Sequence, residues 1–456
     1  MTSGAGQLLN PLLGSRALGE IFSDRGRLQG MLDFEAALAR AEAAVGVIPA
    51  AAAPVIAAQC DAARLDIAAL GEAAALSGNL AIPLVKQLTA LVARQDSDAA
   101  RFVHWGATSQ DVMDTGLVLQ LKAALPQLEA DLARLVDTLA ALAARHRRTP
   151  AVGRTWLQHA LPVTFGLKAA GWLDPLLRHR ERLAELKPRL LVLQFGGAAG
   201  TLASLGDRGI AVTEALAREL QLAAPALPWH AARDRVAEFA AWLGLLAGTL
   251  GKIARDISLL MQTDVAEAFE PAGQGRGGSS TMPHKRNPVA CAAILATATR
   301  APGLVATMLA AMGQEHERGL GNWHAEWTAL PELAIATAGA LEQTADMMAG
   351  LELDPVRMQR NLQATDGLIM AEAVMMALGG KLGRLVAHDR IEAACKLAAA
   401  EHRHLREVLA ADPVIAAELD AASLDRLFDP LNYLGSAETM TDRVLALYQA
   451  KSQERR

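Results

Sequence analysis

One glycine-rich stretch of this chain contains three hydroxyls, an imidazole, two cations and an amide within nine consecutive residues. It covers residues 271–288, PAGQGRGGSSTMPHKRNP, and its polar part runs from Ser279 to Asn287. Glycines let backbone N–H groups face a ligand, and the prolines predict a loop between two helices. Polar groups on a loop of a rigid scaffold are typical of functional sites. We therefore predict a site here, and the alternative is a solvated linker with unrelated polar residues.

A second polar stretch, HWGATSQD, covers residues 104–111 and leads into a helix expected from about Val112. Two interpretations stay open. Ser109 or Asp111 could cap this helix by binding its first free N–H groups. Alternatively, the helix N-terminus and the hydroxyls of Thr108 and Ser109 could hold a carboxylate, because unpaired N–H groups and the helix dipole favour an anion.

Three more stretches stand out by composition. Residues 153–162, GRTWLQHALP, again place a glycine and a hydroxyl before an expected helix, and residues 314–327 are rich in ionisable and indole groups. Residues 194–201 are glycine-rich but lack the ending of a phosphate loop and follow no strand, so we expect close packing or a ligand-facing turn there. No redox or phosphoryl cofactor is expected. No metal site is expected either, since no two histidines stand three or four residues apart on one helix face.

Long helices must position these stretches. Apolar residues recur every three or four positions in the segment 236–270, which predicts one buried stripe. The stripe consists of Leu246, Leu250, Ile253, Ile257 and Leu260. Other helices are expected over residues 17–46, 51–76, 112–148, 290–312 and 331–350. Alternating apolar and polar residues, the pattern of a strand, are found over no useful length.

The predicted fold class is therefore all-α, with three helical domains. A central domain of long bundled helices, residues 112–362, would stand between an N-terminal helical domain, residues 1–111, and a C-terminal one, residues 363–456. Small side chains favour this architecture, because 52% of the residues are hydrophobic and only 4% are aromatic.

Composition also limits the partners. A net charge of -5 over 456 residues gives no indication of nucleic-acid binding. Three widely spaced cysteines indicate a reducing compartment, and the N-terminus shows no signal-like pattern. The most apolar run, residues 239–251, is about 13 residues long and too short to cross a bilayer. We expect a soluble, cytoplasmic protein without a membrane or nucleic-acid partner.

Three of these stretches together resemble the fumarase/aspartase/adenylosuccinate lyase superfamily. GSSTMPHKRNP matches its signature GSSxMPxKxNP at every fixed position, and HWGATSQD and GRTWLQHALP match its other two regions. The resemblance covers nearly the whole chain. It implies a homotetramer with a central bundle of about twenty helices and active sites shared between three subunits. Members eliminate across a bond beside a carboxylate, or run the reverse addition, with the loop serine, here Ser279, as acid or base.

Two departures from the superfamily narrow the expected reaction. Trp156 follows Thr155 where these lyases usually carry a histidine that acts on the leaving or attacking group. Trp327 stands where adenylosuccinate lyases carry an arginine for a nucleotide phosphate. Both departures resemble members that close a lactone ring within a tricarboxylate diene. The nucleophile is then the substrate's own carboxylate, which with a pKa near 4 needs no base, so that only a carbon must be protonated.

The resemblance thus implies a site for a small tricarboxylate. Ser279 would protonate the carbon, and Lys285 would neutralise the charge that develops on the adjacent carboxylate. Trp156 would shape the folded geometry of the diene. The expected substrate-binding residues are His104, Thr108, Ser109, Thr155, Trp156, Gln158, Asn287 and Arg318.

Some assignments stay open at this stage. Ser280 competes with Ser279 as the acid, Trp156 could be an ordinary core indole, and Arg233 and Arg286 could serve salt bridges instead of the substrate. An adenylosuccinate lyase-like carbon–nitrogen lyase is the alternative function. A helical scaffold without activity is a second alternative, from a different class of protein.

Overall fold

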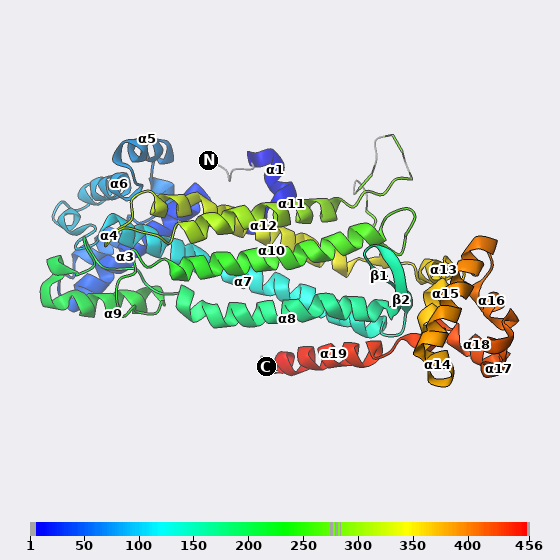
Figure 1. The fold of residues 1–456 in the computed structure, drawn as a ribbon. Helices are drawn as coiled ribbons and strands as arrows, with labels where there is room; N and C mark the ends of the chain where they lie inside the picture. Colours follow the sequence, from blue (N-terminus) through cyan, green and yellow to red (C-terminus); the bar gives the residue numbers. More distant parts are fainter. Residues whose placement is uncertain (1–5, 274–276, 279–280, 283, 454–456) are drawn as a thin grey trace. The chain divides into compact units, whose positions relative to one another are not determined.

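A computed structural model of the chain describes residues 6–273, 277–278, 281–282 and 284–453. Helices dominate this part of the chain, and the all-α fold class predicted from the sequence is confirmed (Figure 1). Ser279 and Ser280, the two competing assignments for the acid, lie outside the described residues.

The chain divides into two compact units, each assembled from three stretches. The first unit contains residues 1–133, 178–251 and 292–344, and the second contains residues 134–177, 252–291 and 345–456. Five helices of 22 or more residues contain residues of both units. The division into three consecutive domains stays a prediction.

Six helices open the first unit. They are α1 (Gly6–Leu13), α2 (Arg16–Ile21), α3 (Asp24–Val45), α4 (Ala52–Ala57), α5 (Ile67–Ser77) and α6 (Ala81–Ala93). The single helix expected over residues 17–46 is two helices, because the Ser23 hydroxyl accepts the N–H of Gly26 and starts α3 anew. Gly46 ends α3 with a φ of 77°, a conformation that glycine adopts without strain.

Five long helices follow and form the main layers of Figure 1. They are α7 (Ser109–Arg145), α8 (Phe165–Leu190), α10 (Asp234–Leu260), α11 (Val289–Ala310) and α12 (Asn322–Ala349), with α9 (Gly209–Leu220) before α10. Within the first unit, the Trp242 indole of α10 donates to the carbonyl oxygen of His179 on α8 at 3.0 Å. Gly251 lets α10 approach α11, since a Cβ there would lie 2.6 Å from Ala298. All five residues of the predicted α10 stripe are buried.

Two helix boundaries differ from the prediction. The helix α10 ends at Leu260, well before residue 270, because strand β3 (Ala268–Phe269) pairs with strand β4 (Glu352–Leu353). Pro331 lies inside α12, although the sequence predicted a helix start there. Leu330 and Leu333 are fully buried beside it, and this burial offsets the backbone hydrogen bond that proline cannot donate.

A β-hairpin stands between α7 and α8, where the sequence gave no strand pattern. Strand β1 (Pro150–Thr155) pairs antiparallel with β2 (Gln158–Thr164), and the register shifts at Gly153 and Arg154. Trp156 and Leu157 form the two-residue turn. The expectation of no strand was therefore wrong at this position, because short strands containing proline, glycine and polar residues do not alternate clearly.

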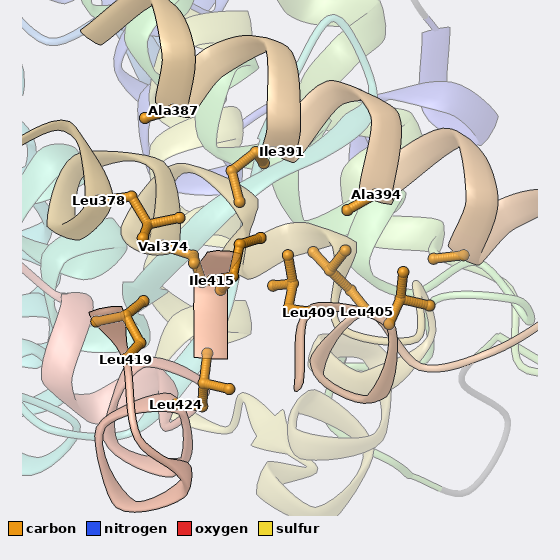
Figure 2. Packing of buried hydrophobic residues seen from close by; sticks show 12 residues of the cluster. Val374, Leu378, Ala387, Ile391, Ala394, Leu405, Leu409, Ile415, Leu419 and Leu424 are labelled. Carbon is orange, nitrogen blue, oxygen red and sulfur yellow. The ribbon is translucent and has the colours of Figure 1, made fainter. Parts of the chain in front are cut away.

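The second unit ends in seven helices, of which α15 and α19 are the longest. They are α13 (Pro355–Gln363), α14 (Ala371–Leu382), α15 (Arg384–Glu401), α16 (Leu405–Ala411), α17 (Pro413–Glu418), α18 (Ala421–Leu427) and α19 (Ala437–Gln453). Figure 2 shows the core that α14 to α18 share, in which Val374 and Leu378 of α14 lie near Ile391 of α15 and Leu409 of α16.

Candidate active site

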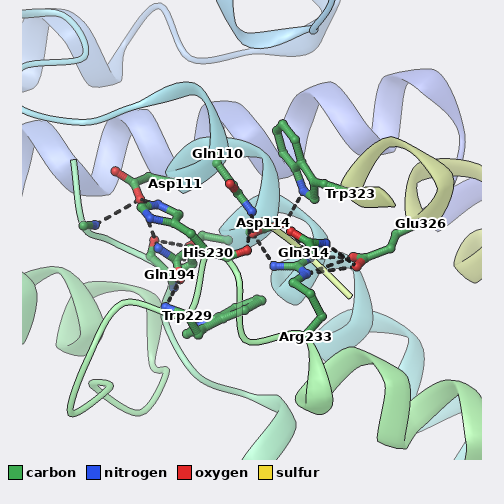
Figure 3. A network of polar contacts seen from close by, with 12 residues as sticks. Gln110, Asp111, Asp114, Gln194, Trp229, His230, Arg233, Gln314, Trp323 and Glu326 are labelled. Carbon is green, nitrogen blue, oxygen red and sulfur yellow. Dashed lines mark hydrogen bonds and ion pairs between the residues drawn. The ribbon is translucent and has the colours of Figure 1, made fainter. Parts of the chain in front are cut away.

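A buried carboxylate fixes the start of α7. Asp111 is 0% exposed and accepts the backbone N–H of Thr108 at 3.0 Å. It also accepts the N–H groups of Gly196 at 3.0 Å and Gly197 at 2.9 Å, and its Oδ1 lies 2.7 Å from His230 Nε2. Figure 3 shows the imidazole of His230 turned toward Asp111. One side chain thus ties the first turn of α7 to the glycine-rich stretch 194–201.

The two hydroxyls of this stretch remain available. Asp111 is the third residue of α7 and binds the N–H of Thr108, which is one half of a capping box, so the capping interpretation holds for Asp111. Thr108 and Ser109 are half-buried, and their hydroxyls make no hydrogen bond within the described part of the chain. These hydroxyls and the first N–H groups of α7 are donors of the kind that a carboxylate needs.

A second buried network joins α7 to α12 (Figure 3). Arg233 is 1% exposed, and its guanidinium donates to Asp114 at 2.6 and 3.0 Å. It also donates to Glu326 at 2.6 Å, and the Trp323 indole donates to Asp114 at 3.0 Å. Burial raises the pKa of Glu326. Arg233 is therefore occupied by an internal ion pair and is not a free cation for a substrate.

His104 is held by a carboxylate from another helix. Its Nδ1 lies 2.5 Å from Oε1 of Glu35 on α3, and the two side chains are 16% and 1% exposed. Burial alone would lower the pKa of His104, but the adjacent Glu35 carboxylate more than offsets this, so the pKa lies above its ordinary value. A half-buried imidazolium four residues before Thr108 is suited to an anionic group.

Arg318 reaches the same glycine-rich stretch. Its Nη2 donates to the carbonyl oxygen of Ala198 at 2.9 Å. In that stretch, Gly197 packs so closely that a Cβ would lie 3.0 Å from the carbonyl oxygen of Gly106. Within the first unit, residues 196–198 therefore lie against Gly106, Asp111 and Arg318, as the packing interpretation of this stretch implies.

The hairpin places Thr155, Trp156 and Gln158 at its exposed end in the second unit. Trp156 is 98% exposed, so the interpretation as a core indole does not hold. The hairpin is anchored close to its turn, where Arg154 donates to both oxygens of Glu267 at 2.6 and 3.0 Å. The exposed turn residues thus stand on a segment that is held by an ion pair.

The signature loop is held near both ends. Arg286 pairs with Glu352 at 3.0 Å and donates to the carbonyl oxygen of Glu270 at 2.7 Å, so the salt-bridge interpretation of Arg286 holds. Lys285 is exposed, and Asn287 is half-buried with its backbone N–H bound to the carbonyl oxygen of Gly277 at 2.9 Å. Both expected loop residues are therefore solvent-accessible on an anchored segment, while Ser279 itself lies outside the described residues.

Three residues that support the site were missed by the sequence interpretation. They are Glu35 beneath His104, His230 beneath Asp111, and Glu352 across from Arg286. For Glu35 a signal existed, because it falls on the spacing of the buried face of α3, where an acid needs a partner. For His230 and Glu352 the partners are distant in sequence, and no local pattern marks them.

A metal centre finds little support in the described residues. His388, Asp389 and Glu392 lie close enough together on α15 to share an ion, but all three are exposed. Glu392 is already paired with Lys396 at 2.5 Å. This arrangement is that of an ordinary charged helix surface.

Comparisons with known proteins agree with these observations. A family model described as lyase matches residues 15–303, and one described as adenylosuccinate lyase C-terminus matches residues 367–444. The 3-carboxy-cis,cis-muconate cycloisomerase of Pseudomonas aeruginosa is 59% identical over 446 residues, which cover 98% of this chain and 97% of that protein. The protein of the same name from Bradyrhizobium diazoefficiens is 60% identical over 98% of this chain and 99% of its own length.

A solved structure gives the same result. The crystal structure of 3-carboxy-cis,cis-muconate lactonizing enzyme from Pseudomonas putida matches with a TM-score of 0.94 and 56% identity, over 98% of this chain and 99% of that one. The family model spans more than half of the chain, and the relatives match along nearly all of it. The chain therefore belongs to the lyase family, the fumarase/aspartase/adenylosuccinate lyase superfamily whose signature it carries in residues 278–288.

Proposed function

We propose that this chain is a cycloisomerase that converts 3-carboxy-cis,cis-muconate to 4-carboxymuconolactone. The observation that carries the proposal is the near full-length identity of 59% and 60% to two proteins with that name. The alternative, a carbon–nitrogen lyase, fits the residues less well. Its leaving nitrogen needs a proton donor, and the position that supplies a histidine in such lyases holds Trp156.

The proposed reaction has a simple balance. A carboxylate oxygen of the substrate forms a C–O bond to the diene, and the π electrons move to the carbon beside another carboxylate. That carbon takes a proton, so three negative charges on the substrate become two on the product, and one proton is taken up from solvent per turnover. Ser279 would deliver the proton, and Lys285 would stabilise the charge that develops on the carboxylate.

The first unit offers the complementary binding groups. Glu35 raises the pKa of His104 and so favours its imidazolium, and Arg318 presents a guanidinium beside the glycine-rich stretch. Thr108 and Ser109 add hydroxyls at the N-terminus of α7 that bind no described residue. Cations and oriented donors are what a tricarboxylate requires, since each carboxylate left without a partner would lose affinity.

We also infer a homotetramer with shared active sites, acting in the cytoplasm in the breakdown of aromatic acids. Two helices, α10 and α11, are long and apolar enough to cross a membrane, but a core helix of a soluble protein passes the same test. Only 33% of the apolar window of α11 is buried, and Leu309 on it is 51% exposed. An exposed apolar helix of this kind is suited to a contact with another copy, which light scattering on the purified protein tests.

The test of the reaction follows the ultraviolet absorbance of the conjugated diene. Protein added to 3-carboxy-cis,cis-muconate without any cofactor should bleach the band, because lactonisation removes the conjugation. Ser279→Ala should slow the bleaching at least a hundredfold, and Ser280→Ala decides which serine acts. If the band persists while a succinyl-purine nucleotide is cleaved, the carbon–nitrogen lyase is correct. If the protein turns over neither substrate, a scaffold without activity would be favoured.

A further inference from the structure

A large pocket opens behind the hairpin in the second unit, and Trp156 is the one residue of its lining to which a role has been given above. Its volume is about 830 Å³, within the range of small-molecule sites. Its walls come from β1 and β2, from α8, from the last turns of α10 and from the end of α13. Two indoles, Trp156 at the mouth and the buried Trp172, give it flat apolar surfaces.

Two of the three basic side chains in this pocket are already neutralised. Arg154 is paired with Glu267 at 2.6 Å. Lys252 is paired with Asp256, whose carboxylate also accepts the indole N–H of Trp172 at 2.7 Å. These two pairs contribute no net charge.

Lys168 on α8 is the exception. It is half-buried and has neither a hydrogen bond nor an ion pair with any described residue. The one further acid of the pocket, Asp264, is exposed and makes no ion pair with it. Burial lowers the pKa of Lys168, although the carboxylates of Glu267 and Asp256, which are paired with Arg154 and Lys252, act in the opposite direction. A half-buried ammonium that makes no direct ion pair with a described residue is suited to a ligand of opposite sign.

A second unpaired polar side chain lines the same pocket. His159 makes no hydrogen bond with a described residue, and its Nδ1 is buried. Burial, with help from Arg154, lowers the pKa of His159, so the imidazole is neutral near pH 7 and can donate one N–H. One unpaired ammonium and one unpaired imidazole between two indoles are suited to carboxylates on a short, unsaturated carbon skeleton.

We propose that this pocket binds a small polycarboxylate, with one carboxylate on the ammonium of Lys168 and a second hydrogen bond from His159. This inference rests on the proposed function, which supplies two such molecules, the tricarboxylate substrate and the dicarboxylate lactone. A divalent cation is disfavoured by the same Lys168. The ligand is therefore anionic, and its source is either the substrate in its reacting position or a separate carboxylate bound behind the hairpin.

The first experiment uses tricarballylate, a tricarboxylate without a double bond that cannot react. Isothermal titration calorimetry on the full chain should show binding to the wild type and a loss of at least tenfold in Lys168→Met. Lys168→Arg, which keeps the charge, should recover part of the affinity. Lys187→Met is the matched control, because Lys187 also lies on α8 but pairs with Glu129 at 2.8 Å, outside the pocket.

A second measurement does not depend on any variant. Brief acetylation of the wild type at pH 7.5, followed by mass spectrometry, should modify Lys168 early, and tricarballylate should protect it selectively. If Lys168 is not modified, or tricarballylate leaves its modification rate unchanged, the pocket is closed or empty and the proposal is wrong. Binding by Lys168→Met at wild-type affinity would contradict it equally.

Turnover then separates the two sources of ligand. A raised KM with little change in kcat for Lys168→Met identifies the substrate itself as the ligand of the pocket. An unchanged KM with lost tricarballylate binding identifies a separate polycarboxylate site. Failure of the proposed function appears differently, as absence of diene bleaching by the wild type while tricarballylate still binds and still protects Lys168.

Discussion

The carboxylate of Glu352 holds the guanidinium of Arg286 with two hydrogen bonds of 3.0 Å each, and it also accepts the backbone N–H of Ala272 at 2.8 Å. Ala272 and Arg286 stand near the two ends of the signature loop. One side chain on strand β4 thus fixes the separation of the loop's ends. The guanidinium also lies 5.1 Å from the ring of Phe269 on β3, so both strands of this short ribbon take part.

Removing this contact should impair activity more than stability. An exposed ion pair contributes about 0.2 to 1 kcal/mol, so Glu352→Ala should lower the melting temperature by only a few degrees. We expect kcat to fall at least tenfold, because Lys285 directly precedes Arg286 and a displacement of 1 Å is costly at a reacting centre. Glu332→Ala, which breaks the comparable Arg300–Glu332 pair between α11 and α12, is the control. Equal kcat values for the two variants would show that Glu352 only stabilises the fold.

Glu42 predicts an unusual dependence of stability on pH. It is 0% exposed, neither carboxylate oxygen has a hydrogen-bond partner among the described residues, and burial raises its pKa to about 9. The unfolded chain ionises this group near its ordinary value of 4.5, whereas the folded chain keeps it protonated. The unfolded state therefore binds fewer protons between these values, and the free energy of unfolding falls as pH rises from about 4.5 to about 9.

Glu42→Gln should remove that decline. With about 1.4 kcal/mol per pKa unit, the gain in the free energy of unfolding is about 3 kcal/mol at pH 7 and close to zero at pH 4. Urea titrations at pH 4, 7 and 9, all at one protein concentration, measure this gain in the free energy of unfolding. Glu20→Gln, at an exposed ion pair on α2, should show no such trend. A gain that does not change with pH would mean that packing, and not ionisation, explains the effect.

Glu35 should control the pH range in which the substrate binds. Because its carboxylate raises the pKa of His104, the imidazolium persists to higher pH than an ordinary histidine would allow. The same pairing stabilises the fold below pH about 6.5 and is lost as pH rises through the raised value. In Glu35→Gln the pKa of His104 should fall, and the rise of KM with pH should begin at lower pH.

Three variants test this assignment by their pH profiles of KM and kcat. His104→Gln should have a high KM that no longer changes across this range. Glu42→Gln, a second buried acid on the same face of α3, should leave the profile where the wild type has it. A profile that is unchanged in Glu35→Gln would show that His104 does not hold the substrate as a cation.

Sequence reasoning worked where the signal was local and periodic. The apolar stripe of α10 and the cap of α3 at Gly46 depend on spacing within one segment, and both are found. The hairpin could not be predicted from such a local signal, because its turn is Trp156-Leu157 and not the Asn-Gly or Asp-Gly pair that marks such turns. Its register shift at residues 153–154 removes any remaining alternation.

Less could be predicted of the candidate site. The motif residues were expected there because three stretches resemble a known superfamily, and their roles stay predictions. The residues that hold them in place were not expected, since tertiary contacts join distant positions. Glu35 lies 69 residues before His104, and Asp111 lies 119 residues before His230. Only the folded structure shows that Glu35 and Asp111 are the hydrogen-bond partners of these two imidazoles.

Trp156 gives the sharpest test of the proposed reaction. Trp156 and Leu157 have φ values of 51° and 64°, and they are 98% and 73% exposed. Left-handed conformations cost bulky residues about 1 kcal/mol or more each, and no burial offsets that cost here. Such strain at a solvent-exposed tip indicates that the indole serves a contact outside its own fold, either a substrate or another copy of the chain.

We therefore expect Trp156→Asn to keep or raise the melting temperature, since asparagine tolerates this conformation, while diene bleaching falls at least a hundredfold. Leu157→Asn relieves comparable strain next to it and should retain most activity. Trp156→His restores the residue type of the carbon–nitrogen lyases and should also be slow, because a lactonisation needs shape at this position and no proton donor. If Trp156→His has full activity and an unchanged KM, the indole only fills space, and catalysis depends on the signature loop alone.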